Sequence, residues 1–120
     1  MAKCDEGYLC EVCSEEVEGL IESALYLQYV IGWIDPETLH TRRECHLRCN
    51  PVLAQFIDDK RFAPMVIEGD LDRRMLDAEF VRERSALVTR GYARLWEINK
   101  RRKNLTVAEY PLEDARARWQ

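Results

Sequence analysis

Two closely spaced pairs of metal-ligating side chains constrain the fold of this chain more than any other feature of its sequence. Cys10 and Cys13 form a Cys-x2-Cys pair, and thirty-two residues later His46 and Cys49 form a His-x2-Cys pair with the same gap. A structural zinc ion takes four ligands of this kind at the corners of a tetrahedron. The spacing therefore predicts one Zn²⁺ ion that joins the pairs, with Cys10, Cys13, His46 and Cys49 as its ligands.

The composition favours metal binding over disulfides. The chain has 120 residues, 47% of them apolar, and no apolar run long enough to span a membrane. The N-terminal residues lack the apolar core of a signal peptide, so we expect a cytoplasmic protein. Thiols stay reduced in the cytosol, and five cysteines cannot all pair within one chain. A small core would also gain from a metal staple.

Other ligands remain open. Cys45 forms a Cys-x3-Cys pair with Cys49 and is therefore the rival of His46. Adjacent residues seldom ligate the same ion, and two pairs with matched gaps are the commoner arrangement, so we prefer His46. His40 and Cys4 are weaker alternatives. The acidic residues around the first pair disfavour thiolates, which argues against a thiol–disulfide redox function.

The ligand pattern resembles a treble-clef zinc finger over about residues 8–57. In that family a knuckle supplies one ligand pair and the start of a helix supplies the other. The pattern also resembles the first half of a LIM module, although the gap is longer here and the second zinc half is absent. The overall layout is similar to small uncharacterised bacterial proteins, a likeness that implies no activity. The resemblance implies a zinc-stabilised N-terminal part and leaves the function open.

Local start and stop signals predict short helices in the first half. Ser23 as N-cap and Gly32 as stop indicate a helix over residues 23–31, but the aromatic and β-branched residues between them indicate a strand nearly as well. Asp35-Pro36 predicts a short turn of helix. Asn50-Pro51 predicts a helix from Pro51 to about Ile57.

The second half is expected to hold one long charged helix. Asp70 is a good N-cap, so we predict a helix over about 71–103, a short strand over 65–67 before it, and a short helical tail after Pro111. Gly91 inside this helix costs about 1 kcal/mol relative to alanine. The predicted fold class is α+β and predominantly helical, with a small zinc-stabilised, treble-clef-like part followed by the long helix.

Charge divides the chain into two predicted parts, 1–59 and 60–120. The first carries twelve acidic and four basic residues, and the second carries ten acidic and fourteen basic residues. Aromatic and arginine side chains anchor protein interfaces. We expect Tyr29 and Trp33 in the core, and leave Trp96 and Trp119 open between core and interface. The predicted partner-binding residues are Arg90, Arg94, Trp96, Lys100, Arg101, Arg102 and Lys103.

These features predict a non-enzymatic adaptor or accessory subunit that docks to a protein partner, or to a second copy of itself, through its helical half. The alternative is a nucleic-acid-binding regulator that uses the basic helix 73–103. An HNH-like nuclease is a distant third, because few candidate catalytic residues remain once His46 is a zinc ligand. We expect no membrane partner and no small-molecule substrate.

Overall fold

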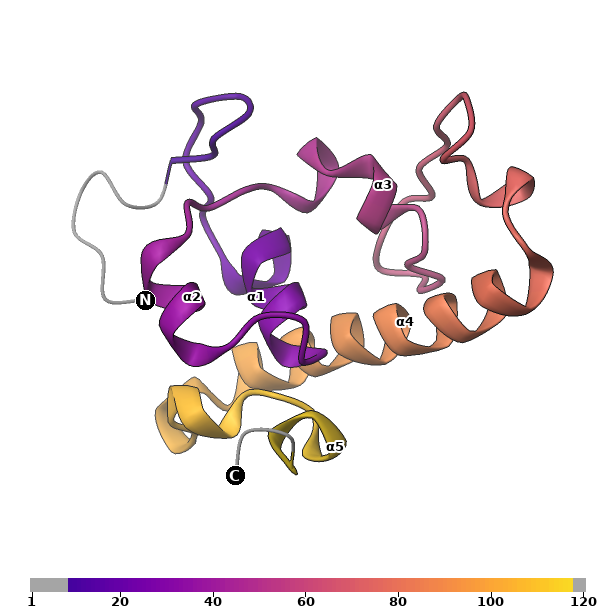
Figure 1. Cartoon of the computed structure of the whole chain (residues 1–120). Helices are drawn as coiled ribbons and strands as arrows, with labels where there is room; N and C mark the ends of the chain where they lie inside the picture. The colour runs from indigo at the N-terminus through magenta and orange to yellow at the C-terminus, as the bar shows by residue number, and fades with distance from the viewer. Residues whose placement is uncertain (1–8, 118–120) are drawn as a thin grey trace.

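The computed structural model describes residues 9–117, apart from the side chain of Arg102, and its regular structure is helical (Figure 1). The only β-structure between residues 9 and 117 is two isolated bridges, Leu9 with Glu16 and Ser23 with His46. The prediction of a predominantly helical chain is thus confirmed. The strand expected over 65–67 is wrong, and the β-part of the predicted α+β class consists of these two bridges. The helices in chain order are η1 (Leu20–Glu22), α1 (Ala24–Val30), α2 (Pro36–Thr41), η2 (Leu47–Cys49), α3 (Pro51–Ala54), η3 (Arg73–Met75), α4 (Ala78–Lys100), η4 (Arg102–Asn104), η5 (Val107–Glu109) and α5 (Glu113–Arg116).

Side-chain caps start the helices of the first half where the sequence predicts them. The Ser23 hydroxyl accepts from an α1 backbone N–H at 3.0 Å, and the stretch that the sequence left open between helix and strand forms the helix α1 (Ala24–Val30). Asp35 caps α2 at 2.7 Å, and Asn50 caps α3 at 3.4 Å. Gly32 has a φ of 85°, a left-handed conformation that glycine adopts without strain, and it ends α1. Helix α3 ends at Ala54, three residues before the predicted end.

The long helix is shorter at both ends than the predicted 71–103. Asp77 caps α4 by accepting from a backbone N–H at 3.0 Å, so the helix begins at Ala78. Asp72 caps the separate turn η3 instead. Asp70 caps nothing among the described helices, which is why the predicted start was wrong. The helix ends at Lys100, and the separate turn η4 begins at Arg102.

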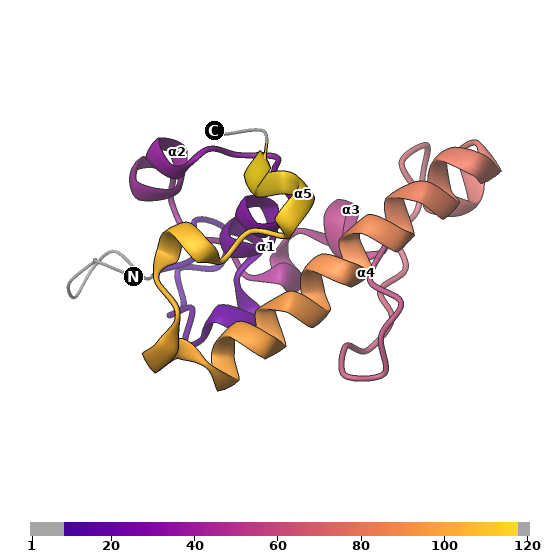
Figure 2. The ribbon, with the colours of Figure 1, turned by 90° about the horizontal axis from the view of Figure 1, so that it is seen from below.

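Helix α4 lies across α1, and the two bury a shared apolar core (Figure 2). Tyr29 is 1% exposed, as predicted, and its hydroxyl donates to the Val107 carbonyl at 3.0 Å. Trp33 is 37% exposed, so its predicted core position is wrong, and its ring instead faces the guanidinium of Arg84 at 4.5 Å. Trp119 lies outside the described residues. The core joins both halves of the chain through Leu27, Val30, Ile31, Val88, Tyr92, Leu95 and Ile98.

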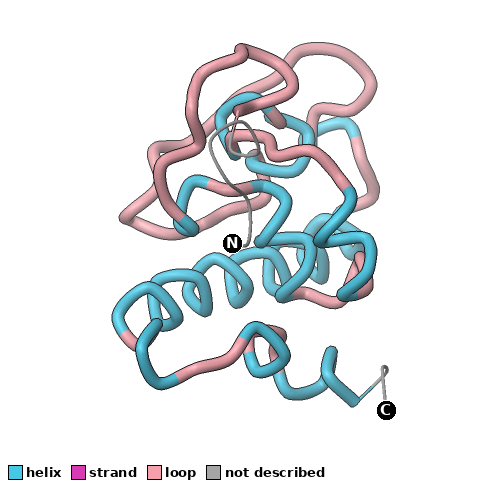
Figure 3. The backbone as a smooth tube through the Cα atoms, turned by 90° about the vertical axis from the view of Figure 1, so that its left-hand side faces the viewer, coloured by secondary structure: helices cyan, strands magenta, loops and turns pink. Residues whose placement is uncertain are grey.

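The segment after α4, residues 101–117, turns back and runs alongside α4 (Figure 3). We call it the tail. The backbone N–H of Leu112 donates to the Val30 carbonyl at 2.8 Å, which fixes this tail to the end of α1. Arg94 of α4 donates to the carbonyls of Tyr110 and Glu109 at 2.9 and 2.7 Å. These bonds hold the tail against both α1 and α4.

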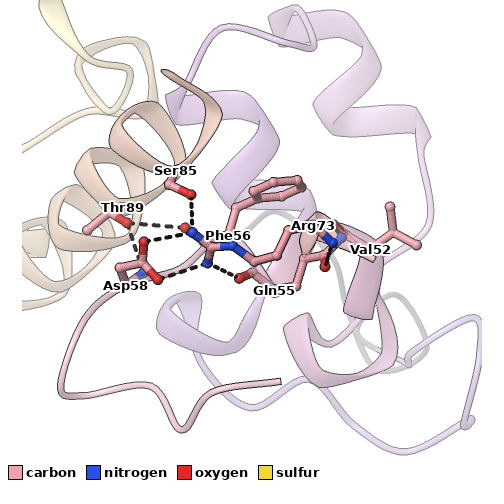
Figure 4. Close-up of polar contacts among 7 residues, drawn as sticks. All are labelled: Val52, Gln55, Phe56, Asp58, Arg73, Ser85 and Thr89. Carbon is pink, nitrogen blue, oxygen red and sulfur yellow. Dashed lines mark hydrogen bonds and ion pairs between the residues drawn. The ribbon is translucent and has the colours of Figure 1, made fainter. Parts of the chain in front are cut away.

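Arg73 holds in place the segment of residues 58–77 that precedes α4, which we call the connector (Figure 4). Its guanidinium donates to the Gln55 carbonyl at 2.8 Å, to both Asp58 carboxylate oxygens at 3.0 and 3.3 Å, and to the Ser85 hydroxyl at 2.8 Å. The Asp58 backbone N–H also donates to the Thr89 hydroxyl at 2.9 Å. The end of α3, the connector and α4 therefore meet at one side chain.

Within residues 9–117, no helix combines the length and the apolar character needed to cross a bilayer.

Candidate metal centre

The first ligand pair lies on a tight turn between residues 9 and 16. The backbone N–H of Cys10 donates to the Glu15 carbonyl at 2.8 Å, and the N–H of Ser14 donates back to the Cys10 carbonyl at 2.9 Å. Ser14 takes a positive φ of 65°, which lets the chain reverse directly after Cys13. The turn thus presents both sulfurs on the same side.

The second pair lies on the segment that enters η2. The Glu11 N–H donates to the Glu44 carbonyl at 2.9 Å, and the Ala24 N–H donates to the Cys45 carbonyl at 2.8 Å. These bonds, with the bridge between Ser23 and His46, hold the segment between the first turn and the start of α1. His46 precedes η2 and Cys49 ends it.

The structure brings all four predicted ligands together, with their ligand atoms within 4.8 Å of one another. The His46 Nδ1 atom lies 3.3 Å from the Cys13 sulfur and 3.9 Å from the Cys49 sulfur. Zinc bonds of about 2.3 Å to sulfur and 2.0 Å to nitrogen place tetrahedral ligand atoms about 3.5–3.8 Å apart. The two distances from His46 Nδ1 are close to these values, so the cluster is compatible with a four-ligand metal site.

Hydrogen bonds fix the orientation of His46. Its Nε2 lies 2.9 Å from the Glu16 carbonyl oxygen, which can only accept, so Nε2 carries the proton. In the neutral imidazole, Nδ1 is then unprotonated and faces the Cys13 and Cys49 sulfurs. Metal-ligating histidines are usually oriented by such a bond from the other ring nitrogen.

The backbone around Cys10 favours its thiolate. Burial alone raises the pKa of this thiol, but hydrogen bonds from the backbone N–H groups of Cys13, His46 and Val12 outweigh burial and lower the pKa to about 6. Burial raises the pKa of Cys49 to about 12, and its hydrogen bonds and repulsion with the Cys10 and Cys13 sulfurs act in the same direction. A divalent cation among these sulfurs would remove that repulsion and favour three thiolates.

The rival ligands lie outside the cluster. Cys45 is buried, and its thiol donates to the His46 carbonyl at 3.4 Å. Burial, followed by the neighbouring Cys10 sulfur, raises the pKa of Cys45 to about 12. His40 is exposed in the last turn of α2. Cys4 lies outside the described residues.

Four of the predicted partner-binding residues line a single concave surface. Arg90, Arg94, Trp96 and Lys100 border a cavity on α4, which adjoins a second cavity beside the metal cluster. Both cavities are lined by Trp96 and by Arg61, and we call them together the Trp96 cleft. The structure does not place Arg101 and Lys103, both exposed, among the residues that line it, and the Arg102 side chain is not described.

Sequence reasoning missed the contribution of the connector and of the metal-bearing segment to this cleft. Arg61 lies over the Trp96 ring at 5.1 Å, and Arg48 lies over the Phe62 ring at 4.5 Å. Neither pair is close in sequence, so no periodicity indicates either contact. An arginine next to an aromatic residue at 61–62 was the only local signal.

No family model, no curated protein sequence and no solved structure matches this chain. Its function must therefore be argued from the geometry of its own residues.

Proposed function

We propose that this chain is a zinc-stabilised adaptor or accessory subunit that docks to a protein partner through its helical half. Three cysteines and one histidine are a donor set that suits Zn²⁺, since the hard cations Mg²⁺ and Ca²⁺ prefer oxygen ligands. Cys10, Cys13, His46 and Cys49 would hold the ion. When bound, zinc would supply folding free energy by joining two distant turns.

A non-enzymatic role is consistent with this ligand set. Four protein ligands complete a tetrahedron, whereas catalytic zinc sites keep one position for water or substrate. The bound ion would then have a structural role and would stabilise the surface next to the metal cluster.

The observation that supports docking is the Trp96 cleft. Arg90, Arg94, Trp96 and Lys100 come from successive turns of α4 and border the same cavity. Tryptophan and arginine are the residue types that most often dominate binding energy at interfaces. A half-buried tryptophan among cations on a metal-stapled scaffold is the feature that best fits a protein-binding surface.

The nucleic-acid alternative has less support. Several of the cations on α4 and directly after it are already engaged: Arg90 pairs with Asp114, and Arg94 and Arg101 pair with Glu97. Paired cations release fewer counterions from a phosphate backbone, and that release drives nucleic-acid affinity.

Affinity purification from the native cell, followed by mass spectrometry, tests the proposal. The wild-type chain should retain one defined protein in stoichiometric amount, and Lys100→Glu should lose most of it. Arg82→Glu is the control, because Arg82 is exposed on α4 but does not line the cleft. Retention of nucleic acid alone, seen as a raised 260/280 absorbance ratio, would support the alternative. Equal capture by all three chains would contradict docking through the cleft.

A further inference from the structure

The cavity next to the metal cluster has the size and lining of a side-chain pocket. Its volume is about 380 Å³, and aromatic and aliphatic side chains form most of its wall, among them Leu47, Phe62, Tyr92 and Trp96. Ligand pockets span about 300–1,000 Å³ and are mostly apolar with a few polar groups. His46 and Cys49 also line it, so the metal-bearing segment forms one wall.

The rim of the Trp96 cleft is cationic although the whole chain has a net charge of −4. Among residues 9–117, only two carboxylates line it, those of Glu22 and Glu97. Arg61 is paired with Asp59 at 2.8 Å, and the Arg90–Asp114 pair is exposed and long at 3.2 Å. No described carboxylate pairs with Arg48 or with Lys100. The five cations that line the cleft are Arg48, Arg61, Arg90, Arg94 and Lys100.

Trp96 carries a second, independent sign of a missing partner. Its indole Nε1 is buried and has no hydrogen-bond acceptor among residues 9–117. Buried donors in folded proteins are nearly always paired, because leaving one unpaired costs the desolvation of the group. The Arg61 guanidinium lies over the same ring at 5.1 Å.

We infer that the Trp96 cleft binds an acidic segment of the partner protein that inserts one large apolar side chain. The apolar side chain would fill the cavity between Phe62, Tyr92 and Trp96. The flanking carboxylates would meet Arg48 and Lys100, and a peptide carbonyl or carboxylate would accept from the Trp96 Nε1. This inference rests on the proposed docking function and adds the chemistry of the partner.

A peptide fits this surface better than a single-stranded nucleic acid. Bases bind by stacking on open aromatic faces. Here Arg48 already covers a face of Phe62, and Arg61 covers a face of Trp96. The cations that have no described carboxylate partner are few and lie at the rim, which suits a short run of carboxylates.

Fluorescence anisotropy with the metal-loaded chain tests the inference. The probe is a labelled synthetic peptide with one tryptophan flanked by glutamates, compared with the same peptide carrying glycine at that position and with labelled oligothymidine. Burial of the apolar side chain should make the tryptophan peptide bind about tenfold more tightly than the glycine peptide. Arg48→Gln should weaken it about threefold. Trp96→Phe, which keeps an aromatic ring but removes the indole N–H, should weaken it by about the same factor or more.

The matched control is Arg82→Gln, which removes the same charge from an exposed position outside the cleft and should leave the affinity unchanged. Equal binding of the two peptides, equal loss in all variants, or preference for oligothymidine would overturn the inference. Affinity purification gives a further test. If Lys100→Glu abolishes capture of the partner protein but Arg48→Gln and Trp96→Phe do not, the inference is overturned and the docking proposal stands.

Discussion

His46 is the residue whose orientation links the two ligand pairs. Its Nε2 donates to the Glu16 carbonyl at 2.9 Å, and its Nδ1 lies 3.3 Å from the Cys13 sulfur. The matched gaps in the sequence were enough to predict which four side chains meet, because a two-residue gap places both members of a pair on one tight turn. The gaps could not predict the tautomer, which depends on a hydrogen bond between residues thirty positions apart.

Two cysteine variants test whether Cys49 or its neighbour Cys45 is the metal ligand. Cys49→Ser should lower zinc affinity by at least about 100-fold, since even outer partners of metal ligands contribute 10- to 100-fold. Cys45→Ser makes the same chemical change four residues away, where a hydroxyl can still donate to the His46 carbonyl, and should leave the metal content unchanged. Elemental analysis of both purified variants checks this. Metal loss in Cys45→Ser alone would instead make Cys45 the ligand.

Zinc affinity should rise with pH, because the thiolate is the form that binds metal. The pKa of Cys10 is lowered to about 6, so this thiolate persists at neutral pH and is protonated only below about pH 6. The pKa of Cys49 is raised to about 12, so metal binding at neutral pH must release its proton. We therefore expect proton release near pH 7 and a steeper loss of affinity below about pH 6. Calorimetry in buffers of different ionisation enthalpy measures both, and binding without proton release would contradict the cluster.

At the scale of elements, capped helix starts were predictable and long-range packing was not. The side chains of Ser23, Asp35 and Asn50 each accept a hydrogen bond from a backbone N–H three residues later. Such caps can therefore be predicted from the local sequence. Asp70 and Asp77 are equally good caps on local grounds. Helix α4 begins directly after Asp77. The hydrogen bonds of Arg73 hold the residues between Asp70 and Asp77 outside the helix.

Gly91 shows how tertiary contacts override helix propensity. A Cβ atom there would lie 2.3 Å from an Ile31 side-chain carbon and 2.9 Å from one of Leu27. Gly91→Ala should therefore destabilise the protein by about 1–2 kcal/mol, although alanine favours an isolated helix by about 1 kcal/mol. Gly19→Ala is the control, since a Cβ atom at Gly19 would have no neighbour within 4 Å. Urea denaturation compares them, and a stabilised Gly91→Ala would contradict the close crossing of α1 and α4.

The Arg73 hydrogen bonds predict a difference between two arginines, Arg73 and Arg82. Arg73→Lys loses the fork that reaches Gln55, Asp58 and Ser85, and should destabilise the protein by about 1–2 kcal/mol. Arg82 is exposed and pairs with Glu79, whose side chain is 71% exposed, so Arg82→Lys should cost less than about 0.5 kcal/mol. Thermal denaturation of the two variants decides it, and equal losses would mean that Arg73 does not hold the connector.

At the scale of the whole molecule, the ligand pairs, α4 and the tail form one connected structure. The segment that carries His46 and Cys49 forms a wall of the Trp96 cleft, and α4 forms another. Composition and spacing could predict a metal site and a basic helix separately. Their meeting around Trp96 depends on the position of Arg61 and Phe62, which only the fold determines.

Loss of the metal should therefore disturb both the first half and the cleft. Without an ion, the two ligand pairs lose the bonds through the metal, and hydrogen bonds such as that from the Glu11 N–H to the Glu44 carbonyl are left to join the two turns. A structural zinc site contributes folding free energy directly. Peptide binding at the cleft should weaken together with helical content when a chelator is added.

The most direct test of a metal-held N-terminal part is thermal denaturation at neutral pH, followed by circular dichroism, with and without a strong chelator. We predict that the chelator lowers the melting temperature sharply and that one equivalent of Zn²⁺ restores it. A melting curve that the chelator leaves unchanged would contradict the central claim that one ion joins Cys10, Cys13, His46 and Cys49.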